Sequence, residues 1–320
     1  MTDERVAVEE LARRLQGQLE KVVFGQAEAV QSLMIALFAG GHILLEGVPG
    51  LAKTLLVKCL AASVSCSFAR VQFTPDLMPA DITGTNVFDP RSGQFEIRRG
   101  PLFSDLVLAD EINRTPAKTQ SALLEAMQEG QVTIDGETHP LSPVFMVVAT
   151  QNPIEYEGTY PLPEAQLDRF LMKIVLPYPA EAQEREMLQS MHRLGEGSRQ
   201  PATQIEVQAR PDELLAARTL AHQTAIDEAV LDYILGLVRG SRTLPGLALG
   251  CSPRTSIMLM HASKALALLR GKDFVSPDEV QAVALPVLRH RVQLTPESEL
   301  EGITADDLLQ RLLAQVAVPR

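Results

Sequence analysis

Residues 43–54 read ILLEGVPGLAKT and carry the strongest structural signal in the chain. The first three residues are an apolar run typical of a buried strand, and a helical pattern begins at Lys53. Between them lies a loop with glycines at positions 47 and 50. In a strand–loop–helix unit of this kind, backbone N–H groups and the positive end of the helix can bind a phosphate. The stretch therefore predicts a phosphate-binding loop at the edge of an α/β sheet.

Two side chains at the end of this loop suit ATP chemistry. The Lys53 ammonium is expected to reach the β- and γ-phosphates, and the Thr54 hydroxyl to coordinate Mg²⁺. Ala52 stands where the general motif has glycine, so the backbone there has to adopt angles that an alanine tolerates. The alternative interpretation is an ordinary glycine-rich turn. The predicted nucleotide-binding residues of this loop are Gly47, Val48, Pro49, Gly50, Leu51, Ala52, Lys53, Thr54 and Leu55.

Two further apolar runs end in polar side chains. Residues 106–109 are followed by Asp110 and Glu111, and the run 144–149 leads to Asn152. Because ligands bind at the carboxyl edge of open α/β sheets, these side chains should lie beside the phosphate-binding loop. We expect Asp110 to hold Mg²⁺, Glu111 to deprotonate the attacking water, and Asn152 to position that water. The sequence thus predicts ATP and Mg²⁺ as cofactors.

Short apolar runs alternate with helical patterns up to about residue 176, which favours a parallel sheet between helices. Segments 86–97 and 131–141 interrupt the alternation, and each has the pattern of a β-hairpin. Beyond residues 177–180 only helical patterns remain. We therefore predict an α/β nucleotide-binding domain over residues 1–180 and an all-helical lid domain over residues 181–320.

The composition is that of a globular protein with an acidic surface. Of the 320 residues, 46% are hydrophobic and 22% are charged, and the net charge is −11. Such a surface repels phosphate backbones, which argues against a nucleic-acid partner. The longest apolar stretch, residues 33–45, is too short for a membrane helix, and the N-terminus does not resemble a signal peptide. Three cysteines without a CxxC pair fit a reducing compartment, so a cytoplasmic location is expected.

The motifs of the chain resemble those of the MoxR family of AAA+ ATPases. The resemblance extends over nearly the whole chain, and Ala52 is the residue that this family carries in its loop. The motifs concerned are GVPGLAKT (47–54), QFTPDLMPADI (72–82), ADEINRTP (109–116), ATQNP (149–153) and EAQLDRF (164–170).

The resemblance implies roles for residues outside the three strand ends. Val23 and Phe24 match the segment that packs on adenine, although core packing is an alternative for both. Arg169 matches an arginine finger that reaches the ATP of the neighbouring subunit. A local salt bridge with Asp168 is the alternative for Arg169, and Arg114 is the next candidate for the finger. Arg254 matches a sensor arginine that closes the lid on the γ-phosphate.

The resemblance also implies a hexameric ring that remodels a client protein bearing a von Willebrand factor A domain. Three alternatives remain: the motor of a metal-chelatase complex, a DNA-dependent motor, and a nucleotide-switched scaffold. The second hairpin is expected to turn through Asp135, Gly136 and Glu137, an acidic tip that would repel DNA. Neither hairpin is expected to pair a basic row with exposed aromatic side chains, as single-strand binders do.

Overall fold

The computed structural model describes residues 2–152, 160–194 and 205–319. Pro153, the last residue of one of the motifs above, lies outside these ranges. Within them, no helix has the length and apolar character needed to cross a membrane.

A five-stranded parallel sheet forms the centre of the nucleotide-binding part, as predicted. The strand order is β2-β5-β8-β1-β9, so β1 lies between β8 and β9. All neighbouring strands run parallel, and their carboxyl ends therefore meet at one edge. The strands are β1 (Ile43–Glu46), β2 (Phe68–Gln72), β5 (Leu106–Asp110), β8 (Met146–Gln151) and β9 (Met172–Val175).

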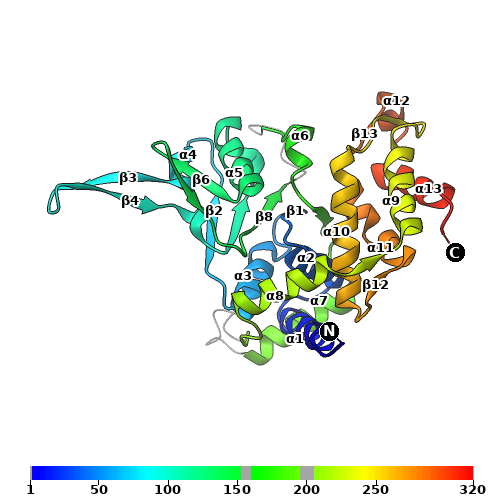
Figure 1. The fold of residues 1–320 in the computed structure, drawn as a ribbon, viewed down its shortest axis with the longest axis horizontal. Coiled ribbons are helices and arrows are strands. Elements are labelled where there is room, and N and C mark those ends of the chain that lie inside the picture. The colour runs from blue at the N-terminus through cyan, green and yellow to red at the C-terminus, as the bar shows by residue number, and fades with distance from the viewer. Residues whose placement is uncertain (1, 153–159, 195–204, 320) are drawn as a thin grey trace.

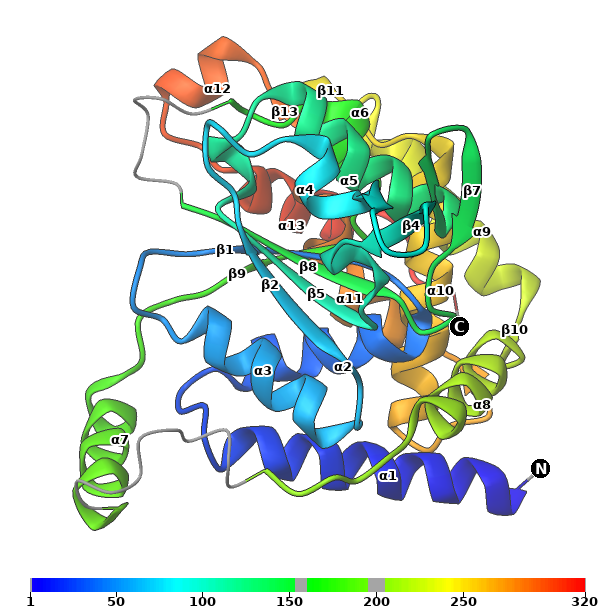
Figure 2. The same ribbon diagram turned by 90° about the vertical axis from the view of Figure 1, so that its left-hand side faces the viewer.

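Helices cover both faces of this sheet (Figure 2). Alternate side chains of each strand enter different cores: Leu106 and Leu108 of β5 lie in one, and Val107 and Ala109 in the other. The first core is closed by α1 (Thr2–Glu20), α2 (Ala27–Ala39) and α3 (Lys53–Ser63), and the second by α4 (Pro79–Thr83) and α5 (Ala117–Glu129). Burial on both faces explains why the strands are continuous apolar runs.

Both predicted hairpins are present. β3 (Gly84–Asp89) pairs with β4 (Gln94–Arg99), and this hairpin projects far from the body of the molecule (Figure 1). β6 (Gln131–Ile134) pairs with β7 (Glu137–Pro140) through a two-residue turn. Asp135 and Gly136 both have positive φ in that turn, at 48° and 89°, as a type I′ turn requires. The side chain of Asn86 donates to Asp135 Oδ2 at 2.8 Å and joins the two hairpins.

Short helical elements lie between these strands. They are the 3₁₀ turns η1 (Pro101–Phe103) and η2 (Ile112–Arg114) and the four-residue helix α6 (Glu164–Leu167).

The C-terminal region is helical, as predicted, with two short strand pairs that the sequence did not indicate. β10 (Ala225–Ile226) pairs with β12 (Phe274–Val275), and β11 (Leu247–Leu249) with β13 (Gln293–Leu294). The helices are α7 (Glu181–Leu194), α8 (Pro211–His222), α9 (Glu228–Ser241), α10 (Pro253–Leu269), α11 (Pro277–Leu288), α12 (Pro296–Leu300) and α13 (Ala305–Gln315).

The helical region packs directly on the helices of the first core. Helices α8 and α10 contact α2, and their apolar side chains join that core. Arg218 of α8 is buried there, and its guanidinium donates to the carbonyls of Leu37, Pro143 and Val144. The helical region is therefore held against the sheet by apolar packing and by a buried cation whose hydrogen bonds are satisfied.

Candidate nucleotide-binding site

The predicted phosphate-binding loop lies between β1 and α3. Gly50 has φ of 90° and Ala52 has φ of 56°, so two residues of the loop are in the left-handed region. For a residue with a Cβ this conformation costs about 1–2 kcal/mol, so Ala52 stores strain where the general motif has glycine. Gly47 packs closely as well, because a Cβ there would lie 3.0 Å from Leu176 Cβ. The loop is thus tightly shaped before any ligand binds.

Lys53 begins helix α3 and its ammonium folds back over the loop. Its Nζ donates to Gly47 O at 2.6 Å. Burial lowers the pKa of Lys53, and the nearby carboxylates of Asp110, Glu111 and Glu46 partly offset this effect. A phosphate bound beside this half-buried ammonium would add negative charge and so stabilise the charged form of Lys53.

Asp110 ends strand β5 and is almost fully buried. Its Oδ1 accepts a hydrogen bond from Thr150 Oγ1 at 2.6 Å. Its Oδ2 accepts from Arg70 Nη2 at 2.7 Å and from Arg70 Nε at 3.1 Å. The sequence analysis did not single out Arg70, which lies on the neighbouring strand β2.

Glu111 follows with φ of 58°, a left-handed conformation that turns its side chain out of the strand. Its backbone N–H donates to Thr150 Oγ1 at 2.9 Å, so Thr150 contacts both acidic residues. The carboxylate accepts from Gln72 Nε2 at 2.7 Å and pairs with Arg114 Nε at 3.2 Å. Arg114, the second candidate for the finger, therefore contacts the acidic residue of its own subunit.

Asn152 lies directly after β8, the strand next to β5. Its side chain is buried, with 6% exposed. The register pairs Ala109 with Ala149, so Asn152 lies just beyond Asp110 at the same edge of the sheet. The structure thus brings the loop, the two carboxylates and this amide to one edge, as predicted.

The donors at this edge suit Mg²⁺. Thr54 offers a hydroxyl and Asp110 a carboxylate, and Mg²⁺ prefers oxygen ligands. No group of three His, Cys, Asp or Glu side chains that could hold a metal occurs in the described ranges. In nucleotide sites, Mg²⁺ commonly takes most of its ligands from water and phosphate, and one or two from protein.

A cavity of about 490 Å³ lies beside the loop. Its size is within the usual range for small-molecule sites. Phe24 lines it, together with Val22, whereas Val23 is packed in the core. Tyr178 and Met187, which the sequence analysis did not single out, also line it, from the segment after β9 and from α7. The remaining lining residues are Lys21, Gln26, Pro49, Gly50, Leu51, Ala52, Leu55, Pro179, Glu184 and Ser190.

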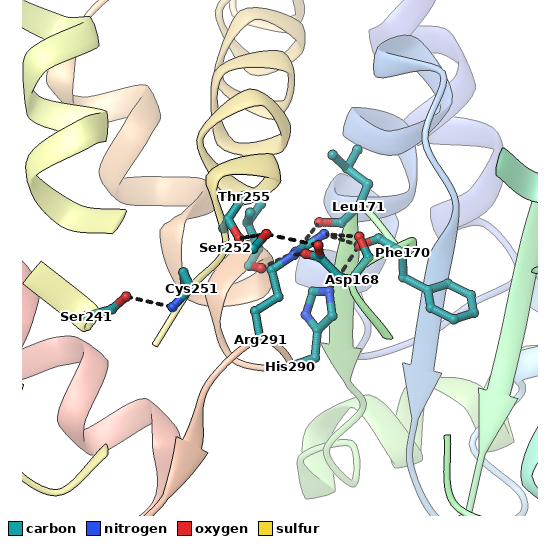
Figure 3. Close-up of polar contacts among 10 residues, drawn as sticks. Asp168, Phe170, Leu171, Ser241, Cys251, Ser252, Thr255, His290 and Arg291 are labelled. Atoms are coloured by element: carbon teal, nitrogen blue, oxygen red, sulfur yellow. Dashed lines mark hydrogen bonds and ion pairs between the residues drawn. The ribbon is translucent and has the colours of Figure 1, made fainter. Parts of the chain in front are cut away.

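Arg169 lies on the segment between α6 and β9, with a half-buried side chain. The alternative of a local salt bridge with Asp168 is wrong. Asp168 instead pairs with Arg291 at 2.7 Å and accepts from Ser252 Oγ at 2.9 Å, both from the C-terminal region (Figure 3). Over the described parts of the chain, Arg169 makes no ion pair, and it borders a hollow with Glu125 and Glu129.

Arg254 is in the first turn of α10, two residues beyond its N-cap Ser252. It lies close enough to Arg291 for its charge to lower the pKa of that residue, though burial is the larger cause. Within the described residues, Arg254 makes no hydrogen bond to the phosphate-binding loop.

Comparison with known proteins places these features in a family context. Residues 42–172 match the ATPase family associated with various cellular activities (AAA), and residues 239–312 match the AAA lid domain. The chain is 43% identical to Chaperone MoxR1 of Mycobacterium tuberculosis, over 95% of this chain and 81% of that protein. It is 31% identical to Protein MoxR of Methylorubrum extorquens, over 96% and 95% of the two chains.

A solved structure shows the same fold. It is a crystal structure of a protein from Cytophaga hutchinsonii that is described as an ATPase. The sequence identity is 41% and the TM-score is 0.91, and the match covers 99% of this chain and 98% of the other.

Proposed function

This chain belongs to the MoxR family of AAA ATPases, and from that membership we propose that it is a ring-forming chaperone driven by ATP. Enzymes of the AAA class hydrolyse ATP and use Mg²⁺, so ATPase activity is the chemistry of this protein. The observation that carries the proposal is the meeting of the loop, Asp110, Glu111 and Asn152 at one sheet edge.

In this proposal each residue at the edge has one task. Lys53 binds the β- and γ-phosphates, and Thr54 and Asp110 would hold Mg²⁺, which lowers the charge on the phosphates when bound. Glu111 takes a proton from the attacking water. Asn152 positions the same water, and Phe24 contacts the adenine.

The proposed site is completed by a neighbouring subunit. Arg169 has no ion-pair partner in the described chain, so its charge is available to a γ-phosphate in the next subunit. That arrangement requires a homo-oligomer, and we propose a hexameric ring. Residues 1–180 then bind the nucleotide, and residues 181–320 form a lid that Arg254 closes on the γ-phosphate.

The first hairpin offers a surface for the client. Phe88 is 50% exposed and Phe95 is 72% exposed, and their rings contact edge to face with centroids 5.4 Å apart. This hairpin thus exposes two aromatic rings, one half of the combination of a basic row with exposed aromatic side chains that neither hairpin was expected to carry. Ile97 lies on the same face in the register and is exposed too. An apolar face of this kind, far from the nucleotide, suits a protein client.

We propose that the client bears a von Willebrand factor A domain, because the resemblance of the motifs to the MoxR family implies a client of this kind. The protein is proposed to act in the cytoplasm, without a nucleic-acid partner or insertion into a membrane. The exposed aromatics leave a single-strand DNA motor as the competing function, because bases stack on such rings.

One binding experiment separates these functions. The Glu111→Gln variant should hold ATP and bind a purified von Willebrand factor A protein of the same organism, whereas Lys53→Ala should not bind it. Single-stranded DNA at physiological salt should leave the ATPase rate unchanged. A DNA stimulation that declines steeply with salt would replace the chaperone proposal with the DNA motor.

A further inference from the structure

The segment 168–171 lies between the sheet and the lid. At its far end the backbone N–H of Leu171 donates to His42 O at 2.8 Å, just before β1. At its near end, the side chain of Asp168 turns toward the lid (Figure 3). Arg169 therefore belongs to a short link, residues 168–171, that is held by hydrogen bonds at both ends, at Asp168 and at Leu171.

Arg291 of the lid holds this link from one side. Its side chain is 2% exposed, and its Nε donates to Asp168 Oδ1 at 2.7 Å. Nη1 donates to the carbonyls of Leu171 and Val287, and Nη2 to those of Asp168 and Phe170. All five N–H groups of the guanidinium thus have an acceptor, and three of those acceptors are backbone oxygens of the link.

Ser252 holds the link from the other side. It is the N-cap of α10, where a serine usually accepts from the helix backbone, yet its side chain makes no capping bond. Its hydroxyl instead donates to Asp168 Oδ2 at 2.9 Å. The two oxygens of Asp168 are therefore bound from two different places in the lid, the start of α10 and the turn after α11 that carries Arg291.

The other lid serine in this position behaves differently. Ser276, the N-cap of α11, donates to Glu279 Oε2 at 2.6 Å within a capping box. Both residues of that bond belong to the lid. A serine at an N-cap therefore does not by itself bond to the link, and Ser252 does so because α10 begins beside Asp168.

From these contacts we propose that Asp168, Arg291 and Ser252 form a latch that sets the position of Arg169 according to the position of the lid. The latch begins two residues from Arg254, so a lid that closes on its own nucleotide would move the finger that serves the next site. This inference rests on the proposed roles of Arg169 and Arg254. It makes Asp168, Arg291 and Ser252 positioning residues, since they act through Arg169.

The energetics favour movement as one unit. A buried ion pair with all donors satisfied is costly to break, because removing one partner leaves an uncompensated buried charge. The lid and the link should therefore move together when the lid moves. Displacement of a transition-state group by about 1 Å costs on the order of 10² in rate, so a loosened latch should be easy to detect.

The test uses two variants of the latch and two matched controls, all as full-length chains. Ser252→Ala removes one of the two latch contacts to the Asp168 carboxylate, together with a 3.4 Å contact to Thr255 Oγ1, without removing a bond to the helix backbone, and Asp168→Ala removes both latch contacts. Ser276→Ala removes a serine–carboxylate bond inside the lid. Asp306→Ala removes an ion pair inside the lid, that of Asp306 with Arg289 at 2.9 Å. Turnover and ATP affinity are measured for each, with Arg169→Ala alongside.

We expect the two latch variants to lose turnover by about tenfold or more while ATP affinity stays nearly unchanged. This loss is smaller than the roughly 10³–10⁵ in turnover that an arginine finger contributes, because Arg169 itself is still present. The two controls should keep turnover. Mixing each latch variant with Glu111→Gln should restore activity, because the Glu111→Gln subunit supplies a well-placed Arg169 to a site with an intact base. A fault confined to the fold of the variant subunit would not be repaired in this way.

Three results would overturn the latch, and the third would also overturn the proposed role of Arg169. Wild-type turnover in both latch variants would refute it. So would a loss that mixing cannot repair, when the same mixing repairs Arg169→Ala. If Arg169→Ala itself keeps full turnover, the assignment of the finger is wrong, and the latch is overturned with it.

Discussion

Arg70 and Asp110 form an ion pair across neighbouring strands, with Nη2 2.7 Å from Oδ2. Forty residues separate them in the sequence, and they meet because β2 lies directly beside β5. Asp110 is the carboxylate proposed to hold Mg²⁺, so this carboxylate has both a protein cation and a metal ion as potential partners.

We predict that Arg70→Gln lowers the Mg²⁺ concentration that gives half-maximal ATPase activity. The Arg70 side chain is 46% exposed, so the pair is worth about 1 kcal/mol or less, and the shift should be about fivefold at most. A magnesium titration of the ATPase rate measures it. Arg91→Gln, on the first hairpin, is the control, and a higher magnesium requirement in Arg70→Gln would contradict the competition.

Binding and hydrolysis should be separable at the sheet edge. Lys53→Ala should lose ATP binding, because Lys53 is the cation that begins α3 at the loop. Glu111→Gln should keep binding while turnover falls by about 10² or more, the scale of general-base catalysis. Nucleotide titrations and single-turnover rates test both, and an equal loss of affinity in the two variants would contradict these roles.

Activity should depend on a contact between subunits. Arg169→Ala should reduce turnover by about 10³ or more, and dilution of the wild-type protein should reduce the rate per subunit. Mixing inactive Arg169→Ala with inactive Glu111→Gln should restore part of the activity. Arg114→Ala is the comparison, because Arg114 pairs with Glu111 of its own subunit. No recovery in rings shown to be mixed would place the finger elsewhere.

The exposed hairpin face should matter for the client and not for basal hydrolysis. Replacing Phe88 and Phe95 by serine should weaken ATP-dependent binding of the von Willebrand factor A protein. Basal ATPase activity should stay within about twofold, the usual effect of a surface change. Phe274→Ser removes a similarly exposed ring, 56% exposed, from the lid and is the control. Equal binding losses in both proteins would argue against a specific hairpin surface.

Acid should destabilise the fold through His42. Its Nδ1 accepts from the backbone N–H of Val147 at 2.9 Å, so Nε2 carries the proton and faces Met127 O at 3.1 Å. Burial lowers the pKa of His42 to about 4 from 6.5, mainly by desolvation. The unfolded chain therefore binds more protons between these two values, and the free energy of unfolding decreases as the pH is lowered across that window.

The stabilisation from neutral His42 is fully present above about pH 6.5 and is lost as the pH falls toward 4. The total loss is about 3 kcal/mol in the free energy of unfolding. We predict that urea midpoints at pH 7 and pH 5 differ less for His42→Gln than for the wild type. The other five histidines are present in both proteins, so an equal pH dependence in the two would contradict the role of His42.

The phosphate-binding loop and the acidic strand end could be predicted because their geometry is local. A strand, a glycine turn and a helix orient backbone N–H groups toward a phosphate wherever they occur together. The carboxyl ends of parallel strands share one edge, so Asp110 and Asn152 could be placed beside the loop before the strand order was known. The two hairpins were also predicted, although β3 and β4 extend two residues beyond the predicted segment at each end.

Other features depend on contacts that sequence spacing does not reveal. Arg70 reaches Asp110 only because β2 is the neighbour of β5, and Tyr178 reaches the cavity only because the segment between β9 and α7 passes beside the loop. The partner of Asp168 is 123 residues away, whereas the sequence suggested only its neighbour Arg169, as an alternative to the finger role. The sequence by itself determined the chemistry of the loop and the strand ends, because short-range geometry fixes it. The tertiary structure decided which charges meet, because strand order and the docking of the lid bring distant residues together.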